Sequence, residues 1–356
     1  MKIRVLVVED SVTTRRHLCE VLSSDPEIEV VGEAGDGKRA IEICKDSRPD
    51  VVTMDMILPV ISGVAATEYI MAYCPTPILV VSSSFNRGEI FKTYEALAAG
   101  AVDVLEKPHG DEPDGVWERS FVAAVKLVSR IRVIAHPRAR LRGLGQRQRV
   151  ATPGALRPPG AARTYRIIAA GASTGGPGAL VEVLSALPSD FSLPVLIVLH
   201  INEPFGAAFA EWLEMQTNRR VAYAEDGQPV SSAAGKIVMA PPNRHLVACE
   251  GRLRLTLEPE RHSCRPSVDP LFESVAREYG SASAACLLTG MGRDGAMGLL
   301  EVRKAGGLTI AQDEATCVVY GMPREAVLLG AAERVLPLEE IGPVLASLGP
   351  GGKEKP

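Results

Sequence analysis

Three residues in the C-terminal half have the side chains of an acyl-transfer site. Ser173 stands in the stretch IIAAGASTGGP, where an apolar run ends in a glycine-rich turn. His200 closes the run LPVLIVLH, and Asp294 lies in GMGRDGA, after the run AACLL. A serine hydroxyl attacks well when a histidine takes its proton, and a carboxylate fixes the tautomer of that histidine. The three residues therefore predict a nucleophilic serine with a histidine base and an orienting aspartate.

Each of these residues also has a simpler interpretation. A serine in a glycine turn often caps a helix, a histidine at a strand end is often structural, and aspartate is common in turns. However, GASTG matches the G-x-S-x-G elbow in its strand–turn–helix context, and the coincidence of all three residues favours catalysis. Their order along the chain, Ser…His…Asp, is not that of the usual α/β-hydrolases, so membership of that fold does not follow.

The turn GASTGGPG also resembles the dinucleotide-binding turn of short-chain dehydrogenases. Such a site requires an acid at the end of the second strand, where this chain has His200. The Tyr-x-x-x-Lys motif of that family is absent after residue 164. We therefore reject nucleotide binding by this turn.

A second group of reactive side chains follows the apolar runs of the N-terminal half: Glu9 and Asp10 after the first run, Asp55 after the third, Ser82 after the fourth and Lys107 after the fifth. The carboxyl ends of parallel strands meet at one sheet edge, where clustered carboxylates repel unless a cation joins them. Such oxygen ligands suit Mg²⁺, while a lysine and a hydroxyl hold phosphoryl oxygens. The five residues predict a Mg²⁺ site at which an aspartate accepts a phosphoryl group.

The elements that must position both groups follow one rhythm. In residues 1–125 and again in residues 164–348, short apolar runs alternate with helical patterns. Continuous apolar strands that alternate with helices are typical of a parallel sheet covered on both faces. We predict an α/β protein of two doubly wound parallel-sheet domains. The second has a short β-rich insertion formed by KIVMAP, HLVACE and RLRLTLE.

The predicted domains are residues 1–125 and residues 164–350. Residues 126–163 hold the end of a helix and a basic, flexible linker, and residues 351–356 form a tail. Residues 130–163 contain nine arginines and no Lys, Asp or Glu, although the 356-residue chain carries a net charge of −4. Pro and Gly are frequent there and no aromatic residue is present to stack on bases. We therefore expect an exposed linker and no binding of nucleic acid.

Composition limits where the protein can act. No apolar run reaches the roughly 18 residues that a membrane span needs, so no membrane insertion is expected. The N-terminus becomes acidic by Glu9 and is not a signal peptide. The seven cysteines lack CxxC spacing, as expected for reduced thiols in a cytoplasmic protein. Asp294, His262 and Cys264 lack the spacing of a metal site, so no cofactor is expected in the second domain.

The motifs VLVVEDS, DVVTMDMILPVISG, VVSSS and VLEKP resemble the receiver domain of bacterial two-component response regulators, across nearly all of residues 1–125. The resemblance implies these roles at the strand ends: Asp55 as phosphoacceptor, Glu9, Asp10 and Asp55 as Mg²⁺ ligands, and Ser82 and Lys107 as phosphoryl contacts. It also implies a cis peptide bond at Lys107–Pro108. Ile57 and Val104 depart from the common receiver pattern, and Val104 puts the usual aromatic signalling switch in doubt.

The C-terminal motifs are similar, in order, to the catalytic domain of the CheB family of chemotaxis methylesterases. They are GASTGGP, VLH, MAPPNRH, RPSVDPLFESVA, LTGMGRDGA and GGLTIAQDEATCVVYGMPREA. The resemblance implies hydrolysis of γ-glutamyl methyl esters, with release of methanol, and deamidation of glutamines. It implies these roles by position: Ser173 as nucleophile, His200 as general base and acid, Asp294 as orienting carboxylate, and Thr174, Met291 and Gly292 near the oxyanion.

A receiver in front of a methylesterase implies two kinds of partner. These are a chemosensory histidine kinase as phosphodonor and methyl-accepting chemoreceptors as substrates. The predicted function is a phosphorylation-activated hydrolase that gives adaptation in a chemosensory pathway. The alternative is a non-catalytic receiver that acts as an adaptor or phosphate sink and docks on receptors. The complete set of Ser173, His200 and Asp294 favours the enzyme.

Overall fold

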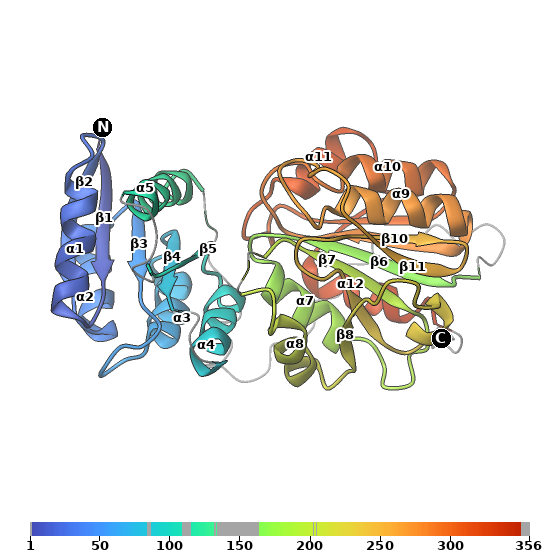
Figure 1. The fold of residues 1–356 in the computed structure, drawn as a ribbon, viewed down its shortest axis with the longest axis horizontal. Helices are drawn as coiled ribbons and strands as arrows, with labels where there is room; N and C mark the ends of the chain where they lie inside the picture. Colours follow the sequence, from blue (N-terminus) through green and yellow to red (C-terminus); the bar gives the residue numbers. More distant parts are fainter. Residues whose placement is uncertain are drawn as a thin grey trace.

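The computed structural model of the chain describes residues 2–83, 87–108, 115–131, 133, 164–201, 203 and 205–349. Two lobes lie side by side, one from the N-terminal and one from the C-terminal part of the chain (Figure 1). Each contains its own parallel sheet with helices on both faces. The prediction of an α/β protein with two doubly wound domains is confirmed. The predicted basic linker lies almost entirely outside the described residues.

The N-terminal lobe is a five-stranded parallel sheet in the order β2-β1-β3-β4-β5. Its elements are β1 Ile3–Val8, α1 Val12–Ser23, β2 Ile28–Ala34, α2 Gly37–Ser47, β3 Val51–Met54, α3 Gly63–Tyr73, β4 Ile78–Ser82, α4 Arg87–Ala98, β5 Asp103–Glu106 and α5 Val116–Val128. In β1, Leu6 and Val8 belong to the core under α2, α3 and α4, whereas Val5 and Val7 belong to the core under α1 and α5. Both faces of the strand are buried, which explains its unbroken apolar run.

The C-terminal lobe has a seven-stranded sheet in the order β14-β13-β12-β6-β7-β9-β8, and every pairing is parallel. Its elements are β6 Ile167–Ala172, α7 Gly176–Ser185, β7 Val195–Leu199, α8 Phe209–Thr217, β8 Val221–Tyr223, η1 Val230–Ala233, β9 Ile237–Met239, β10 His245–Cys249, β11 Arg252–Thr256, α9 Val268–Tyr279, η2 Gly280–Ala282, β12 Ser283–Leu287, α10 Ala296–Lys304, β13 Leu308–Gln312, α11 Met322–Leu328, β14 Arg334–Leu336 and α12 Leu338–Ala346. Helices α7, α8 and α12 cover one face, and α9, α10 and α11 the other.

Some elements differ from the sequence-based expectation. The patterns do not predict α3, β8, β14 or α12. The strands β8 and β14 are three-residue edge strands, too short to show a pattern, and α12 contains Pro343, which argues against a helix in sequence. The expected β-rich insertion is smaller than predicted, because β9 joins the main parallel sheet. The antiparallel pair consists of β10 and β11 alone.

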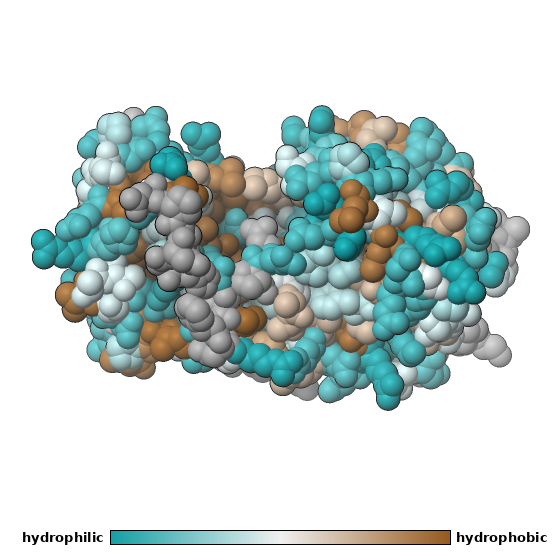
Figure 2. Space-filling model, in the orientation of Figure 1, coloured by the Kyte–Doolittle hydropathy of each residue, from teal (hydrophilic) through white to brown (hydrophobic). Residues whose placement is uncertain are grey.

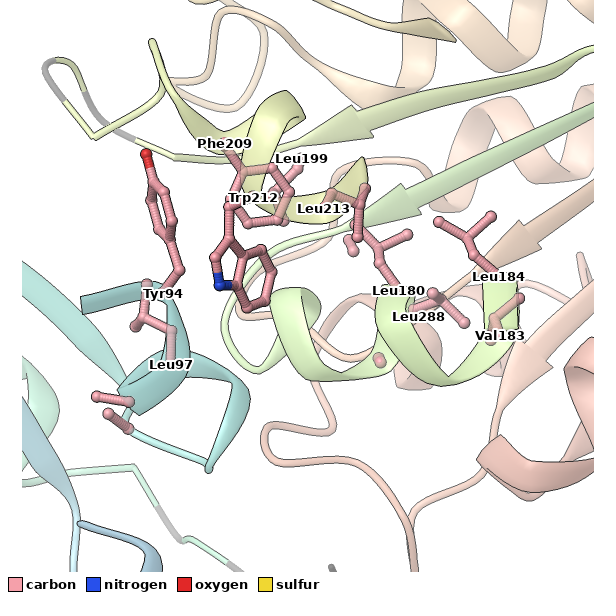
Figure 3. Packing of buried hydrophobic residues seen from close by; sticks show 14 of the residues in the cluster. Tyr94, Leu97, Leu180, Val183, Leu184, Leu199, Phe209, Trp212, Leu213 and Leu288 are labelled. Carbon is pink, nitrogen blue, oxygen red and sulfur yellow. The ribbon is translucent and has the colours of Figure 1, made fainter. Parts of the chain in front are cut away.

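The two lobes meet through α4. The ring of Tyr94 lies 5.2 Å from that of Phe209 and 5.5 Å from that of Trp212, both on α8 (Figure 3). The Tyr94 hydroxyl also donates a hydrogen bond to the carbonyl oxygen of Phe205. All four side chains are buried. The apolar core on this face of the N-terminal sheet therefore continues into the core under α7 and α8.

Two further contacts join α4 to the C-terminal lobe, one at the start of α7 and one on α8. A Cβ at Gly178 would lie 2.7 Å from the carbonyl oxygen of Ala98, so glycine alone permits this approach of the helices. At the rim of the contact, the Arg87 guanidinium pairs with the Glu211 carboxylate. The N-terminal lobe thus abuts the helix that follows the turn of Ser173.

The exterior is largely hydrophilic on the face that Figure 2 shows, with hydrophobic residues in smaller patches. The large apolar side chains instead form three buried cores. Within the described residues, no helix combines the length and apolar character needed to cross a membrane.

Candidate active site and phosphoacceptor site

Ser173 lies directly after β6, in the turn that leads into α7. Its N–H donates to the carbonyl oxygen of Thr289 at 3.0 Å, and its own carbonyl oxygen accepts from Gly176 N at 2.7 Å. Gly175 has φ +76°, and a Cβ there would lie 2.5 Å from the Cβ of Val318. Glycine is therefore required at this position, both for the backbone conformation and for space. The glycine-rich sequence shapes a turn that holds the serine at the sheet edge.

His200 and Asp294 reach the same edge from the strands on either side of β6. His200 follows β7, and its backbone N–H donates to the carbonyl oxygen of Ala172 at 3.1 Å. Asp294 lies in the loop after β12. The imidazole Nε2 of His200 lies 2.8 Å from Asp294 Oδ2. The strand order β12-β6-β7 thus places the strand that leads to Ser173 between the strands that lead to His200 and Asp294.

The carboxylate of Asp294 is buried and accepts four hydrogen bonds besides its contact with His200. The donors are Ser267 Oγ and the N–H groups of Val268, Asp269 and Gly295, at 2.7–3.2 Å. Two of these amides belong to the first turn of α9, where free N–H groups favour negative charge. Burial by itself raises the pKa of Asp294, but His200, Ser267 and the α9 amides outweigh burial, so its pKa is lowered. The side chain is therefore an ionised carboxylate.

Asp294 in turn determines the protonation of His200. A carboxylate only accepts hydrogen bonds, so Nε2 carries the proton and Nδ1 presents its lone pair. Nδ1 faces Sγ of Cys264 at 3.6 Å. Burial lowers the pKa of His200, but the contacts with Asp294 and Cys264 outweigh burial and raise its pKa to about 9. His200 is thus a stronger base than an exposed histidine.

Ser173 and His200 lie at the same sheet edge, but their side chains are not hydrogen-bonded to each other. Within the described residues, no hydrogen bond joins the Ser173 hydroxyl to His200; catalytic contacts of this kind often tighten only when substrate binds. A Cβ at Gly290 would lie 2.8 Å from the Cβ of Ser173, so the loop that follows Gly290 borders the serine. The N–H groups of Thr174, Met291 and Gly292 donate to no acceptor in the described part of the chain. These amides are available to an oxyanion.

The predicted phosphoacceptor site lies at the edge of the N-terminal sheet. Lys107, after β5, places its Nζ 2.9 Å from Glu9 Oε2 and 3.0 Å from Asp55 Oδ2. Both carboxyl groups are buried. Burial raises the pKa of Asp55 in spite of Lys107, and burial together with the Asp55 charge raises the pKa of Glu9. One ammonium group does not offset two buried carboxylates, so a further cation would be stabilised here.

The arrangement of oxygen atoms fits a divalent metal ion. One carboxylate oxygen each from Glu9, Asp10 and Asp55 lies within 4.8 Å of the others. Among the described residues, no group donates a hydrogen bond to the buried Oε2 of Glu9, although Lys107 Nζ forms an ion pair with it. Asp10 is exposed and leaves the site open to solvent. Hard oxygen donors of this kind, with room for water, suit Mg²⁺.

Ser82, the last residue of β4, is turned toward α4. Its hydroxyl donates to Glu89 Oε1 at 3.1 Å, and Ser83 N donates to the same oxygen at 2.8 Å. Glu89 belongs to the first turn of α4, the helix that also carries Tyr94. The predicted phosphoryl contact is therefore tied to the helix that joins the two lobes.

The predicted cis bond at Lys107–Pro108 is wrong. Among the described residues, the cis peptide bond is Arg265–Pro266. Lys107 N donates to the carbonyl oxygen of Ser82 at 2.9 Å, and its Nζ reaches both carboxylates with the following bond trans. The intrinsically favoured isomer thus already positions the ammonium group.

The chain is similar to known proteins over nearly its whole length. Residues 168–345 match the family described as CheB methylesterase, and residues 5–113 match the response regulator receiver domain. The chain is 44% identical over 346 residues to protein-glutamate methylesterase/protein-glutamine glutaminase 2 of Anaeromyxobacter dehalogenans, covering 97% of each chain. It is 43% identical over 353 residues to the protein of the same activities in Nitrosospira multiformis, again covering 97% of each. This chain belongs to the CheB methylesterase family.

The CheB methylesterase and receiver resemblances drawn from the motifs are thereby confirmed. Among solved structures, the chain is similar to the catalytic domain of the Thermotoga maritima CheB methylesterase at 36% identity. That match covers 52% of this chain and 98% of the other, with a TM-score of 0.49.

Two contacts of this CheB methylesterase were not predicted. Ser267 supports Asp294 and lies in RPSVDPLFESVA, so the motif itself was a signal for it. Cys264 contacts His200 across 64 positions of sequence, and no spacing along the chain indicates that pair. The fold brings Cys264 to His200 from the loop after β11, so their contact does not depend on a short spacing along the chain.

We expect hydrolysis by this CheB methylesterase to depend on pH through His200. The imidazole accepts a proton only when it is neutral, so kcat/KM should rise with pH through a midpoint near 9 and then level off. Cys264→Ala removes one of the contacts that raise the pKa of His200 and should move the midpoint to lower pH. Steady-state rates across the pH range, with a metal chelator present, measure both midpoints. A midpoint near the ordinary histidine value of about 6.5 in both proteins would contradict this assignment.

Proposed function

We propose that this chain hydrolyses glutamate γ-methyl esters on chemoreceptors and deamidates receptor glutamines, under the control of phosphorylation at Asp55. The observation that carries the proposal is the 2.8 Å contact of His200 Nε2 with a buried, ionised Asp294, beside the turn of Ser173. The names of the full-length relatives support the two activities. Methanol release from methylated receptors and ammonia release from receptor glutamines measure them directly. A purified, phosphorylated chain that released neither would refute the proposal.

In the proposed mechanism, Ser173 attacks the carbonyl carbon of the ester while Nδ1 of His200 takes the hydroxyl proton. Amides near Thr174, Met291 and Gly292 stabilise the tetrahedral oxyanion, at about 3–4 kcal/mol for each well-placed donor. The imidazolium then protonates the leaving oxygen, and methanol departs. Water, deprotonated by His200, attacks the acyl-enzyme and releases the glutamate carboxylate and free Ser173. A glutamine amide loses ammonia by the same route.

In this proposal, residues 1–125 form the domain that accepts the phosphoryl group, and residues 164–350 form the domain that hydrolyses the ester. Residues 126–163 would link the two parts, and residues 351–356 would form a tail. A chemosensory histidine kinase would be the phosphodonor. Mg²⁺ bound by Glu9, Asp10 and Asp55 would neutralise charge on the acceptor and on the incoming phosphoryl group. Lys107, already beside Asp55, would contact a phosphoryl oxygen, as would Ser82 once its hydroxyl left Glu89.

The receiver is proposed to restrain the hydrolase by its position. Helix α4 packs on α7 and α8, and its Tyr94 bonds to the carbonyl of Phe205, five residues after His200. A cavity of about 750 Å³ is bordered by Arg130 and Ile131, after α5, and on its other side by the active-site loops near Met291 and Tyr320. A receptor helix approaching Ser173 from this side would meet the receiver. Phosphorylation would favour release through the Ser82–Glu89 contact at the start of α4.

This restraint predicts the behaviour of the full-length wild type and of two full-length variants. A small phosphodonor with Mg²⁺ should raise hydrolysis about tenfold, which requires a change of only ~1.4 kcal/mol in the docking equilibrium. Tyr94→Ala removes the contacts with Phe205, Phe209 and Trp212, so its activity without phosphodonor should already be high. Asp55→Asn should not respond to the phosphodonor. Initial rates of methanol release measure all three.

The control for the Tyr94 variant is Tyr69→Ala, which removes a receiver tyrosine from α3 whose ring packs against that of Tyr73. It should retain low basal activity and a normal response. If Tyr94→Ala were no more active than the unphosphorylated wild type, the docked receiver could not be the restraint.

A further inference from the structure

Cys264 has a contact that ester hydrolysis does not require. Its Sγ lies 3.6 Å from Nδ1 of His200, the nitrogen that must receive the serine proton. The thiol is half-buried and free of any disulfide. It comes from the loop between β11 and α9, whereas His200 follows β7. A soft sulfur and an imidazole nitrogen, from two separate segments, thus converge beside the catalytic serine.

The separation of the two atoms matches one edge of a tetrahedral zinc site. Zinc binds thiolate sulfur at about 2.3 Å and imidazole nitrogen at about 2.0–2.1 Å, and tetrahedral bond angles then place the two ligands about 3.6 Å apart. Sγ of Cys264 and Nδ1 of His200 have that separation without any movement. Hard ions such as Mg²⁺ prefer oxygen ligands, so the pair selects a soft cation.

The surroundings of His200 are also those of a metal-bound histidine. Such histidines usually donate their second N–H to a carboxylate, which orients the ring and leaves the other nitrogen free to bind. Nε2 of His200 makes this contact with Asp294 at 2.8 Å. The Asp294 oxygens are in turn occupied by Ser267, Val268, Asp269 and Gly295, so this carboxylate supports the histidine and need not bind the ion itself. The side chain of His200 is 14% exposed, which leaves access for the ion and for water as remaining ligands.

We propose that His200 Nδ1 and Cys264 Sγ form a binding site for Zn²⁺ and that the bound ion reversibly blocks hydrolysis. Binding releases the thiol proton to solvent and forms one Zn–S and one Zn–N bond, with water completing the coordination. The ion occupies the lone pair that would otherwise accept the Ser173 proton, so acylation stops. With only two protein ligands the site exchanges its ion, as an inhibitory site must. The inhibitory part of this proposal rests on the proposed role of His200 as base.

Cobalt provides a direct test of the site that does not depend on catalysis. The full-length chain is titrated with Co²⁺ while excess Mg²⁺ occupies the receiver carboxylates, and thiolate-to-cobalt charge transfer is followed in the near-ultraviolet. The wild type should show this absorption and Cys264→Ser should lose it. Cys249→Ser, which alters another half-buried free thiol at the end of β10, is the matched control and should retain it. Equal absorption in the two variants, or none in the wild type, would overturn the site.

Zinc inhibition tests the consequence for hydrolysis. For the wild type, Cys264→Ser and Cys249→Ser, the rate of hydrolysis with Zn²⁺ is compared with the rate of the same protein without zinc. A chelator should restore the activity of the wild type. Because loss of a supporting group alone typically weakens metal binding 10–100-fold, loss of the thiol ligand should raise the half-inhibiting Zn²⁺ concentration at least tenfold. Thermal unfolding of each variant controls for folding.

The two measurements separate failure of the site from failure of the mechanism. Inhibition of equal strength in the wild type and Cys264→Ser would overturn the site as the cause of inhibition. Cobalt absorption that depends on Cys264, without any loss of hydrolysis, would overturn the inhibitory claim. That outcome would leave the proposed role of His200 as base to its own test, the pH dependence of hydrolysis.

Discussion

Ser173→Ala should lower methanol release from methylated receptors by about 10⁴–10⁶-fold while leaving phosphorylation of Asp55 unchanged. The hydroxyl is the only group of the proposed mechanism that forms a covalent bond with the substrate. The turn that holds it depends on backbone contacts with Thr289 and Gly176, and a methyl side chain preserves both. The change should therefore remove chemistry without removing structure. Rates of methanol release and the extent of labelling by a phosphodonor measure the two outcomes.

The control for this variant is Ser185→Ala, at the exposed end of the same helix, α7. It should hydrolyse esters at the rate of the wild type. Retention of more than about a thousandth of the wild-type rate by Ser173→Ala would identify another residue as the nucleophile, since loss of a triad nucleophile costs more than this.

Asp294→Asn should lower the rate of hydrolysis by about 10⁴-fold. The carboxylate accepts a hydrogen bond from Nε2 of His200, and this contact keeps the lone pair on Nδ1. An amide nitrogen at the same position donates instead, so the imidazole would adopt the opposite tautomer and could not take the serine proton. Steady-state kinetics with a methylated receptor should place the loss in kcat, because substrate contacts remain.

The Asp294 variant also carries a cost in stability, because its oxygens accept from Ser267 and three backbone amides. Thermal unfolding must therefore accompany the kinetics. Glu273→Gln is the matched control, since Glu273 is an acid of α9 that pairs with Arg261 outside the proposed catalytic set. Hydrolysis by a folded Asp294→Asn protein at the rate of Glu273→Gln would show that the carboxylate does not orient the base.

Much of the fold is determined by local sequence. The central strands of both sheets are buried on both faces, as in Ile167–Ala172 and Val195–Leu199, so their sequences are unbroken apolar runs that stand out between helical patterns. The edge strands β8 and β14 have three residues each and depend on their neighbours for stability. A pattern that short carries no periodicity, which explains why both strands escape prediction.

The candidate residues could also be located from sequence, because a residue that follows a strand of a parallel sheet must lie at the carboxyl edge of that sheet. This argument indicates Ser173, His200 and Asp294, and likewise Asp55 and Lys107. Their mutual contacts require the strand order as well. The order β12-β6-β7 places the strands of the three catalytic candidates side by side, and this order is a property of the whole sheet.

Only the tertiary structure decides what surrounds these residues. Cys264 meets His200 across 64 positions and Tyr94 meets the carbonyl of Phe205 across 111. Contacts of this range arise from the packing of loops and helices around the sheets, and no local period in the sequence indicates them. The sequence by itself determines two α/β domains with reactive groups at their sheet edges. The packing decides that α4 abuts the helix after Ser173 and that a thiol faces Nδ1 of His200, the proposed base.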